Sequence, residues 1–148
     1  MRRQKGHALL ELALSAAVMV TCLTGTFRFG YTFYIYNELV TAVGNAGRYA
    51  AVRSYRAASP EDVERGKAAI RNMAVYGNPS PAPGAVPVVP NLTLEQVQVS
   101  YVAGAAGEPP TAVDVSIVNY TAGSFTLDKR PSVEFPFVGR YAPQEREP

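Results

Sequence analysis

The sequence predicts an α+β fold, in which a long N-terminal helix packs on a small antiparallel sheet and a second, short helix completes the domain. Three observations predict it. The chain has 148 residues and 12 prolines, and every proline lies at Pro60 or later, so none interrupts a helix over residues 1–59. Apolar residues recur at helical spacing as far as about Tyr55. Beyond Pro90, apolar and polar residues alternate as they do in half-buried strands.

Composition excludes several classes of function. The formal net charge is +2, from 14 Lys and Arg against 12 Asp and Glu, which is too weak a balance to indicate nucleic-acid binding. One cysteine cannot make an internal disulfide or a Cys-rich zinc site, and one histidine disfavours a His-cluster metal site or a His-dependent triad. The sequence contains no phosphate loop, metal-ligand spacing or nucleophile elbow. We therefore expect no enzyme activity, no metal and no cofactor.

The N-terminus combines a basic leader with an apolar run of about 20 residues, the length of a membrane-spanning helix. The basic residues of the leader are Arg2, Arg3 and Lys5. No charged residue lies between Leu12 and Phe27, and the one acid in the run is Glu11. Because a basic flank keeps the N-terminus cytoplasmic, the following chain is predicted to lie outside the cytoplasm.

Other kinds of N-terminal segment fit less well. A cleavable secretory signal has an apolar core of roughly 7–15 residues and an A-x-A-like site, whereas this run is longer and no such site follows it. A lipoprotein signal would acylate Cys22, but the residues before it, 19–21, lack the required small residue. Cys22 is more simply a small apolar residue in a helix. A plain signal anchor stays open.

Glu11 indicates a more specific role for this helix. A carboxylate near the centre of a membrane segment costs about 2.5–3.5 kcal/mol on insertion scales, and less near an end. Gly6 lies five residues earlier, at the end of the leader, and this pattern resembles the processing site of type IV pilin-like proteins, in which a peptidase cuts after the glycine. Such a cut would expose the amine of His7. An ammonium and a carboxylate attract strongly in low dielectric, and such a pair between subunits would set the register of a filament. The alternative is that Glu11 sits among lipid headgroups and reaches water.

Helical periodicity continues beyond the apolar run, and a helix from Ala8 to Tyr55 would be about 70 Å long. Its aromatic stretch, residues 27–36, is typical of a membrane–water interface or of helix packing. The predicted apolar face comprises Phe29, Phe33, Tyr36, Val40, Val43, Gly47 and Ala50. The predicted polar face comprises Glu38, Thr41, Asn45, Arg48 and Arg56.

The second half of the chain predicts a small exported domain. Ser59 and Pro60 form a helix-start signal, and Gly77 is a plausible stop. Residues 78–90 contain five prolines and predict an extended loop. A break or bulge is expected near Glu95, where the apolar parity changes. Four strands are then predicted, around residues 97–101, 113–117, 125–127 and 133–137.

Several segments together carry a resemblance to a known family. They are Gly6 to Glu11, Leu12-Ala13-Leu14, Phe29-Gly30 and Ala46-Gly47-Arg48-Tyr49-Ala50-Ala51. The chain resembles TadE-type minor pseudopilins of the tight-adherence (Flp) type IV pilus system. The motifs match as far as Arg56, and the remainder matches only in layout. The sequence departs from the family at His7, at Leu12, where an aromatic is frequent, and at Ala17, where a proline is common.

The resemblance implies a pilin-like fold and a structural role in pilus assembly and cell adhesion. Prepilin peptidase would cut between Gly6 and His7, and Glu11, Phe29 and Gly30 would act in subunit assembly. Implied partners are the peptidase, other pilins and minor pseudopilins, the inner-membrane assembly platform and membrane lipid, with no nucleic acid. The chain would cross the bacterial inner membrane once, with its N-terminus cytoplasmic, and could enter the extracellular pilus.

The predicted segments are a leader at 1–6, a transmembrane and assembly helix at 7–28, its exported continuation at 29–58 and a small α+β domain at 59–148. Losing the three bases of the leader would leave 11 basic against 12 acidic residues, a net charge of −1. The principal alternative is a single-pass, membrane-anchored periplasmic binding or assembly module that never enters a filament. An anchored hydrolase is a third hypothesis, disfavoured because candidate catalytic groups do not cluster.

Overall fold

The structure is a computed structural model that describes the chain except residues 1, 53–59, 105–109, 123–124, 127–129 and 139–148. For residues 2–5, 122 and 125–126 it describes the backbone alone. Two compact units divide the chain, Met1–Tyr34 and Ile35–Pro148. Helix α1 (Arg2–Val52) contributes to both units, so each unit is described by itself. The predicted end of this helix near Tyr55 lies outside the described residues.

Helix α2 (Pro60–Tyr76) begins and ends as the sequence predicts. Proline suits a first helical position because its missing N–H has no partner there, and Glu61 and Asp62 lie at the positive end of the helix dipole. At the other end Gly77 has φ 68° and donates its N–H to the Met73 carbonyl at 3.0 Å. This left-handed residue closes the helix, and glycine adopts that conformation without steric cost. The predicted N-cap, Ser59, lies outside the described residues.

Three strands form an antiparallel sheet in the order β1 (Val97–Val102), β2 (Ala112–Ile117) and β5 (Ser132–Pro136). The register pairs Val99 with Val115, and Val115 with Val133. The 3₁₀ turn η1 (Leu94–Gln96) precedes β1, which confirms the predicted break near Glu95. The third predicted strand differs: β4 (Phe125–Thr126) pairs only with β3 (Thr121–Ala122), in a separate two-stranded ladder.

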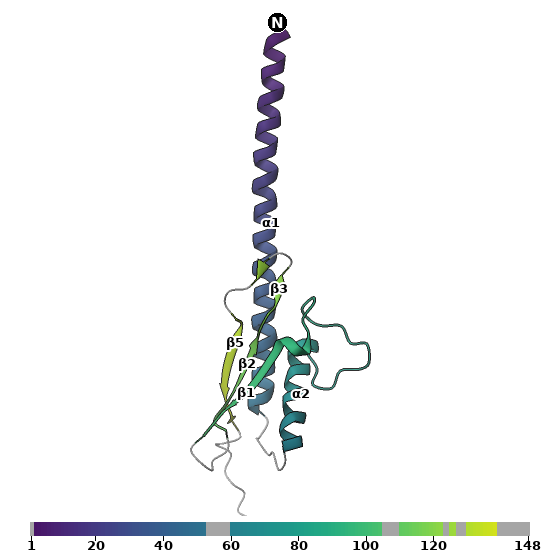
Figure 1. Cartoon of the computed structure of the whole chain (residues 1–148), viewed down its shortest axis with the longest axis vertical. Helices are drawn as coiled ribbons and strands as arrows, with labels where there is room; N and C mark the ends of the chain where they lie inside the picture. The colour runs from purple at the N-terminus through teal and green to yellow at the C-terminus, as the bar shows by residue number, and fades with distance from the viewer. Residues whose placement is uncertain (1, 53–59, 105–109, 123–124, 127–129, 139–148) are drawn as a thin grey trace, which may run out of the picture. The chain divides into compact units, whose positions relative to one another are not determined.

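The core of the second unit lies between the sheet and the two helices, with α2 beside the end of α1 (Figure 1). Because side chains alternate along a strand, the helix-facing positions of β1 and β2 are apolar, and the other face carries the polar residues together with Val102 and Ala112. The buried cluster joins all these elements, and its largest members are Ile35, Leu39, Leu92, Ile117, Val43, Val75, Val89, Val97, Val113 and Val115. The sheet thus buries one face on α1 and α2, and the predicted α+β architecture is confirmed.

The predicted apolar face of α1 is partly wrong. Val43, Gly47 and Ala50 are buried as expected, but Phe29 and Phe33 are exposed and belong to the first unit. The face that meets the sheet begins at Ile35, the first residue of the second unit. It consists of Ile35, Leu39, Ala42, Val43, Ala46, Gly47, Ala50 and Ala51. On the predicted polar face Thr41, Asn45 and Arg48 are exposed, Glu38 is half-buried, and Arg56 lies outside the described residues. Aromatic residues misled the prediction because large apolar side chains also fit a membrane boundary.

The proline-rich segment after α2 forms the predicted extended loop, with neither helix nor strand over residues 78–90. It is tied to α2 by two hydrogen bonds. Val88 N–H donates to the Val75 carbonyl at 2.8 Å, and the Asn72 amide donates to the Pro79 carbonyl at 3.1 Å. Further along, the Tyr120 hydroxyl donates to the Pro90 carbonyl at 2.8 Å. These bonds hold the loop beside the C-terminal end of α2.

Candidate functional site

The first unit presents an apolar helical surface that the described residues of the chain leave uncovered. From Gly6 to Tyr34 every residue is exposed except Thr32, which is half-buried. The large exposed side chains include Leu9, Leu10, Leu12, Leu14, Val18, Met19, Val20 and Leu23. An apolar surface of this extent is unfavourable in water and marks contact with lipid or with another protein.

Near its N-terminal end α1 is long enough and apolar enough to cross a membrane. None of its most apolar window is buried within the chain. A core helix of a soluble protein satisfies the same requirement of length and composition but is mostly buried, so the exposure of this segment disfavours that reading. A signal sequence near the N-terminus also satisfies it, and the two are distinguished by the processing experiment below.

The threonines of the apolar segment have their hydrogen bonds inside the helix. Each hydroxyl donates to the carbonyl four residues earlier, over 2.8–3.0 Å. The four are Thr21, Thr24, Thr26 and Thr32. A hydroxyl paired in this way needs no water, which lowers the cost of placing it in an apolar medium.

The predicted processing residues lie together on the first turns of α1. Gly6 and His7 are exposed, and a side chain at Gly6 would meet nothing within 4 Å. Glu11 is exposed and lies four residues after His7, so the two share one face of the helix. Arg2, Arg3 and Lys5 belong to α1, although their side chains are not described. Both residues are exposed, and the peptide bond between Gly6 and His7 lies within helix α1.

Phe29 and Gly30, the other two predicted assembly residues, lie about 27 Å further along the helix from Glu11. Phe29 is 75% exposed, and a side chain at Gly30 would also meet open space. The structure therefore brings these two together with each other but not with Glu11. Exposed aromatics surround them: Phe27, Tyr31, Phe33 and Tyr34.

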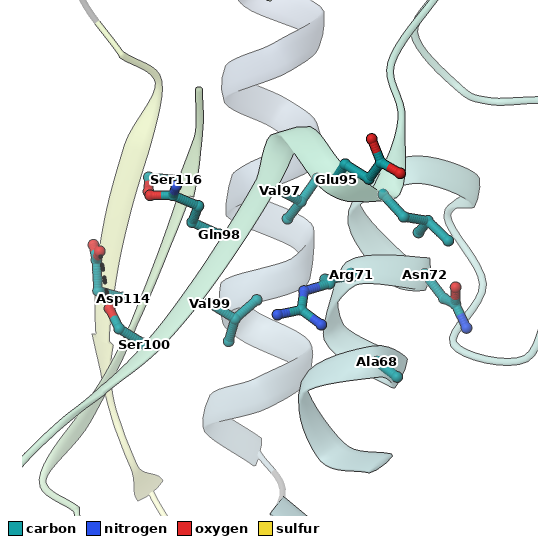
Figure 2. A pocket seen from close by; sticks show the side chains of 11 residues that line it. Ala68, Arg71, Asn72, Glu95, Val97, Gln98, Val99, Ser100, Asp114 and Ser116 are labelled. Atoms are coloured by element: carbon teal, nitrogen blue, oxygen red, sulfur yellow. Dashed lines mark hydrogen bonds between the residues drawn. The ribbon is translucent and has the colours of Figure 1, made fainter. Parts of the chain in front are cut away.

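The second unit carries a groove between α2 and the sheet (Figure 2). Its volume is about 590 Å³. The α2 wall presents Ala68, Arg71 and Asn72, and the strand wall includes Val99, Ser100 and Asp114. On the strand wall the Ser100 hydroxyl donates to an Asp114 carboxylate oxygen at 3.5 Å.

The charges on α2 are mostly paired along the helix. Arg65 binds Asp62 at 3.0 Å and Lys67 binds Glu64 at 2.8 Å, each pair three residues apart. The hydrogen bond from Lys67, and then its positive charge, hold the pKa of Glu64 below its usual value, with a smaller effect of Arg71. A lowered carboxylate pKa favours the folded state above the unfolded pKa, and that contribution is lost as the pH falls through the folded value.

Sequence reasoning missed this groove because its walls come from residues that are far apart in the chain. One signal was available, since Arg71 has no acid three or four residues away on either side. Glu95 and Asp114 line the groove, and Glu134 lies opposite Asp114 in the register. Among the described residues, no three His, Cys, Asp or Glu gather as they would to hold a metal ion.

Comparisons with protein-family models, with curated proteins and with solved structures give no match.

Proposed function

We propose that this protein is a pilin-like minor subunit, similar to TadE-type pseudopilins, that takes part in assembling a tight-adherence type IV pilus. One observation carries the proposal: the apolar segment of α1 after the exposed Gly6 has almost every residue exposed as far as Tyr34 and Glu11 as its one acid, and the helix continues into a folded α+β unit. Such a helix needs lipid or other helices around it. The folded unit beyond it supplies a surface outside the membrane.

In this proposal the chain inserts with its basic leader in the cytoplasm and is trimmed after Gly6. The new ammonium of His7 and the Glu11 carboxylate then lie at the buried end of the helix. Each lowers the free-energy cost of burying the other, either within one helix or between neighbouring subunits. The groups act through binding, and no bond is made or broken by this chain.

The processing step predicts a defined product. Co-expression with an active prepilin peptidase should convert the 148-residue chain to one that begins at His7, whereas Gly6→Leu should stay uncut because a side chain replaces the glycine at the cut. Intact-mass spectrometry and N-terminal sequencing measure both. A wild-type chain that keeps its leader beside an active peptidase, verified on a known substrate, would contradict the proposal. A cut elsewhere in the apolar run would indicate an ordinary signal sequence.

Assembly predicts a different defect for Glu11→Ala. Cleavage should continue, but incorporation into filaments should fall sharply, because removing one partner of a buried ion pair costs about 3–5 kcal/mol. The ratio of this subunit in purified pili to that in the membrane measures incorporation. Glu38→Ala is the matched control, since Glu38 is a half-buried acid of the same helix in the second unit. Equal incorporation of the Glu11 and Glu38 variants would refute the charge pairing.

The second candidate is a membrane-anchored periplasmic binding or assembly module, and the groove of the second unit favours it. Both candidates need the apolar helix, but only a filament subunit has many identical or related helices around it. Cys22 is an exposed free thiol within the apolar segment and reports on such neighbours. A photoreactive crosslinker attached to the Cys22 thiol, with Cys22→Ser as the control, should give crosslinks to neighbouring pilin subunits in an assembled pilus and none for an isolated anchor.

A further inference from the structure

The two free edges of the three-stranded sheet are unlike each other. Strand β5 is bounded by prolines, since Pro131 precedes it and Pro136 is its last residue, and it carries Glu134. Prolines and charges are the usual means by which an edge strand avoids pairing with other chains. Strand β1 has six residues with neither a proline nor a charge. The edge of β1 therefore lacks the features that prevent an edge strand from pairing with another chain.

The register shows which groups β1 presents at that edge. Val118 N–H donates to the Gln96 carbonyl at 2.9 Å, directly before the strand. Because hydrogen-bonding residues alternate along an antiparallel pair, Gln98 and Ser100 direct their backbone groups to β2. Val99 therefore directs its N–H and C=O away from β2, while Val97 N–H is already bonded to the Leu94 carbonyl. Val99 is the residue at which an added strand would pair fully.

The groove follows this edge, because residues from both faces of β1 line it. Val97 and Val99 belong to the helix-facing side, whereas Gln98 and Ser100 belong to the outer side. Only a space that runs past the edge of a strand touches both sets. Figure 2 shows Arg71 of α2 extending toward Val99 across this space. A segment lying there would place alternate side chains toward α2 and toward the outer face.

Three charged side chains line the groove: Arg71 on the α2 side, Asp114 on the outer side, and Glu95 in η1 before β1. On the α2 side Arg71 makes no ion pair with any described residue, in contrast to Arg65 and Lys67. On the outer side lies the Asp114 carboxylate, with the Ser100 hydroxyl beside it. An entering strand is complementary to the groove when an acidic side chain meets Arg71 and basic side chains meet the outer face.

We propose that the free edge of β1 binds an extended segment of another protein as an additional strand. The segment bonds to Val99 through its backbone, directs an acidic side chain to Arg71 and carries basic side chains on the opposite face. This is recognition by strand addition, in which backbone bonds give affinity and alternate side chains give specificity. It depends on residues of α2, η1, β1 and β2 and does not rest on processing at Gly6.

The test uses the full chain in detergent micelles and an acetylated, amidated peptide, Lys-Val-Lys-Glu-Lys-Val-Thr. Its central Glu and the two Val residues face α2, and the Lys residues face outward. A second peptide replaces the Glu by Lys, and a third is N-methylated at the Glu. Binding is followed by amide chemical shifts and by hydrogen exchange at Val99. The wild-type chain should bind the Glu peptide at least about tenfold tighter than either other peptide, with slowed exchange at Val99.

Two variants separate recognition from folding. Arg71→Glu should reverse the preference between the Glu and Lys peptides. Arg65→Glu changes a base on the same helix that is already paired with Asp62, outside the groove lining, and should leave the preference unchanged. A reversed preference would show that the Arg71 side chain discriminates between the charges of the two peptides while the protein stays folded.

Three results would overturn the proposal. The first is equal binding of all three peptides, or none. The second is binding without added protection at Val99, which would indicate attraction by charge alone. The third is a chain that self-associates in sedimentation with Val99 already protected, because a second copy would then occupy the edge. None of these results depends on whether Gly6 is cut.

Discussion

Replacing Leu39 by alanine is expected to lower the free energy of unfolding of the second unit by about 2–5 kcal/mol. Leu39 is 0% exposed and lies in the buried cluster where α1 meets the sheet. The loss combines the transfer of buried methyl groups with the cavity that remains, because close-packed neighbours relax only partly. No other change of one side chain on α1 removes more buried apolar volume in the middle of this contact.

The measurement is a urea titration of the full chain in detergent, followed by tyrosine fluorescence, since the chain has 9 tyrosines and no tryptophan. Val40→Ala is the matched control: it removes apolar atoms from the next residue, which is 45% exposed. Its effect should stay within about 1 kcal/mol. Similar losses for the two variants would show that α1 is not anchored to the sheet through Leu39.

Gly47→Ala is expected to destabilise the second unit by about 1–3 kcal/mol, although alanine favours a helix by about 1 kcal/mol over glycine. A Cβ added at Gly47 would lie 2.5 Å from Phe135 Cδ2 and 3.0 Å from Val133 Cγ1. Both side chains belong to β5 and pack against the core, so the Phe135 ring, the strand or the helix must shift. The clash outweighs the gain in helix propensity.

Gly44→Ala provides the comparison, since a Cβ there meets nothing within 4 Å. It should keep the propensity gain and stabilise the unit by up to about 1 kcal/mol. The two substitutions are therefore expected to have opposite signs in the same titration. A stabilising Gly47→Ala would mean that β5 does not approach α1 as closely as the structure shows.

Much of the fold could be predicted from local sequence. The long helix follows from an uninterrupted, proline-free segment, and the end of α2 from Gly77, whose φ of 68° suits glycine. Strands β1, β2 and β5 follow from alternation over five or six residues. The separate ladder of β3 and β4 was not predictable, because two-residue strands carry no periodicity.

The face of α1 that meets the sheet was harder to predict. In the sequence Phe29, Phe33 and Val40 belong to the predicted apolar face of the helix, but in the structure all three are exposed. The face that meets the sheet includes small residues instead, such as Ala42 and Ala46. Small side chains let the helix axis approach the strands. The Ala-Gly-rich segment that carries part of the family resemblance thus has a packing role in this unit, at Gly47 above all.

The processing residues and the groove also differ in how far the sequence alone could predict them. Gly6, His7 and Glu11 are adjacent in the chain, so their spacing could be read directly, and their roles stay predictions that the processing and incorporation experiments test. The groove depends on the pairing of Ser100 with Asp114 and on α2 lying beside β1, which are tertiary facts. A lone unpaired arginine on a helix is too common to predict a groove by itself.

The hydroxyl groups of the four threonines are bonded within the helix, so they need no hydrogen-bond partner from the surrounding medium. Moving the apolar segment from lipid to the interior of a protein bundle would leave those hydroxyl bonds intact. Within residues 6–34 the only acid is Glu11, so this carboxylate is the acidic group whose energy distinguishes one apolar environment from another. In the proposed assembly, the transfer of this segment from lipid to a bundle of helices is therefore expected to depend on whether a cation lies beside Glu11.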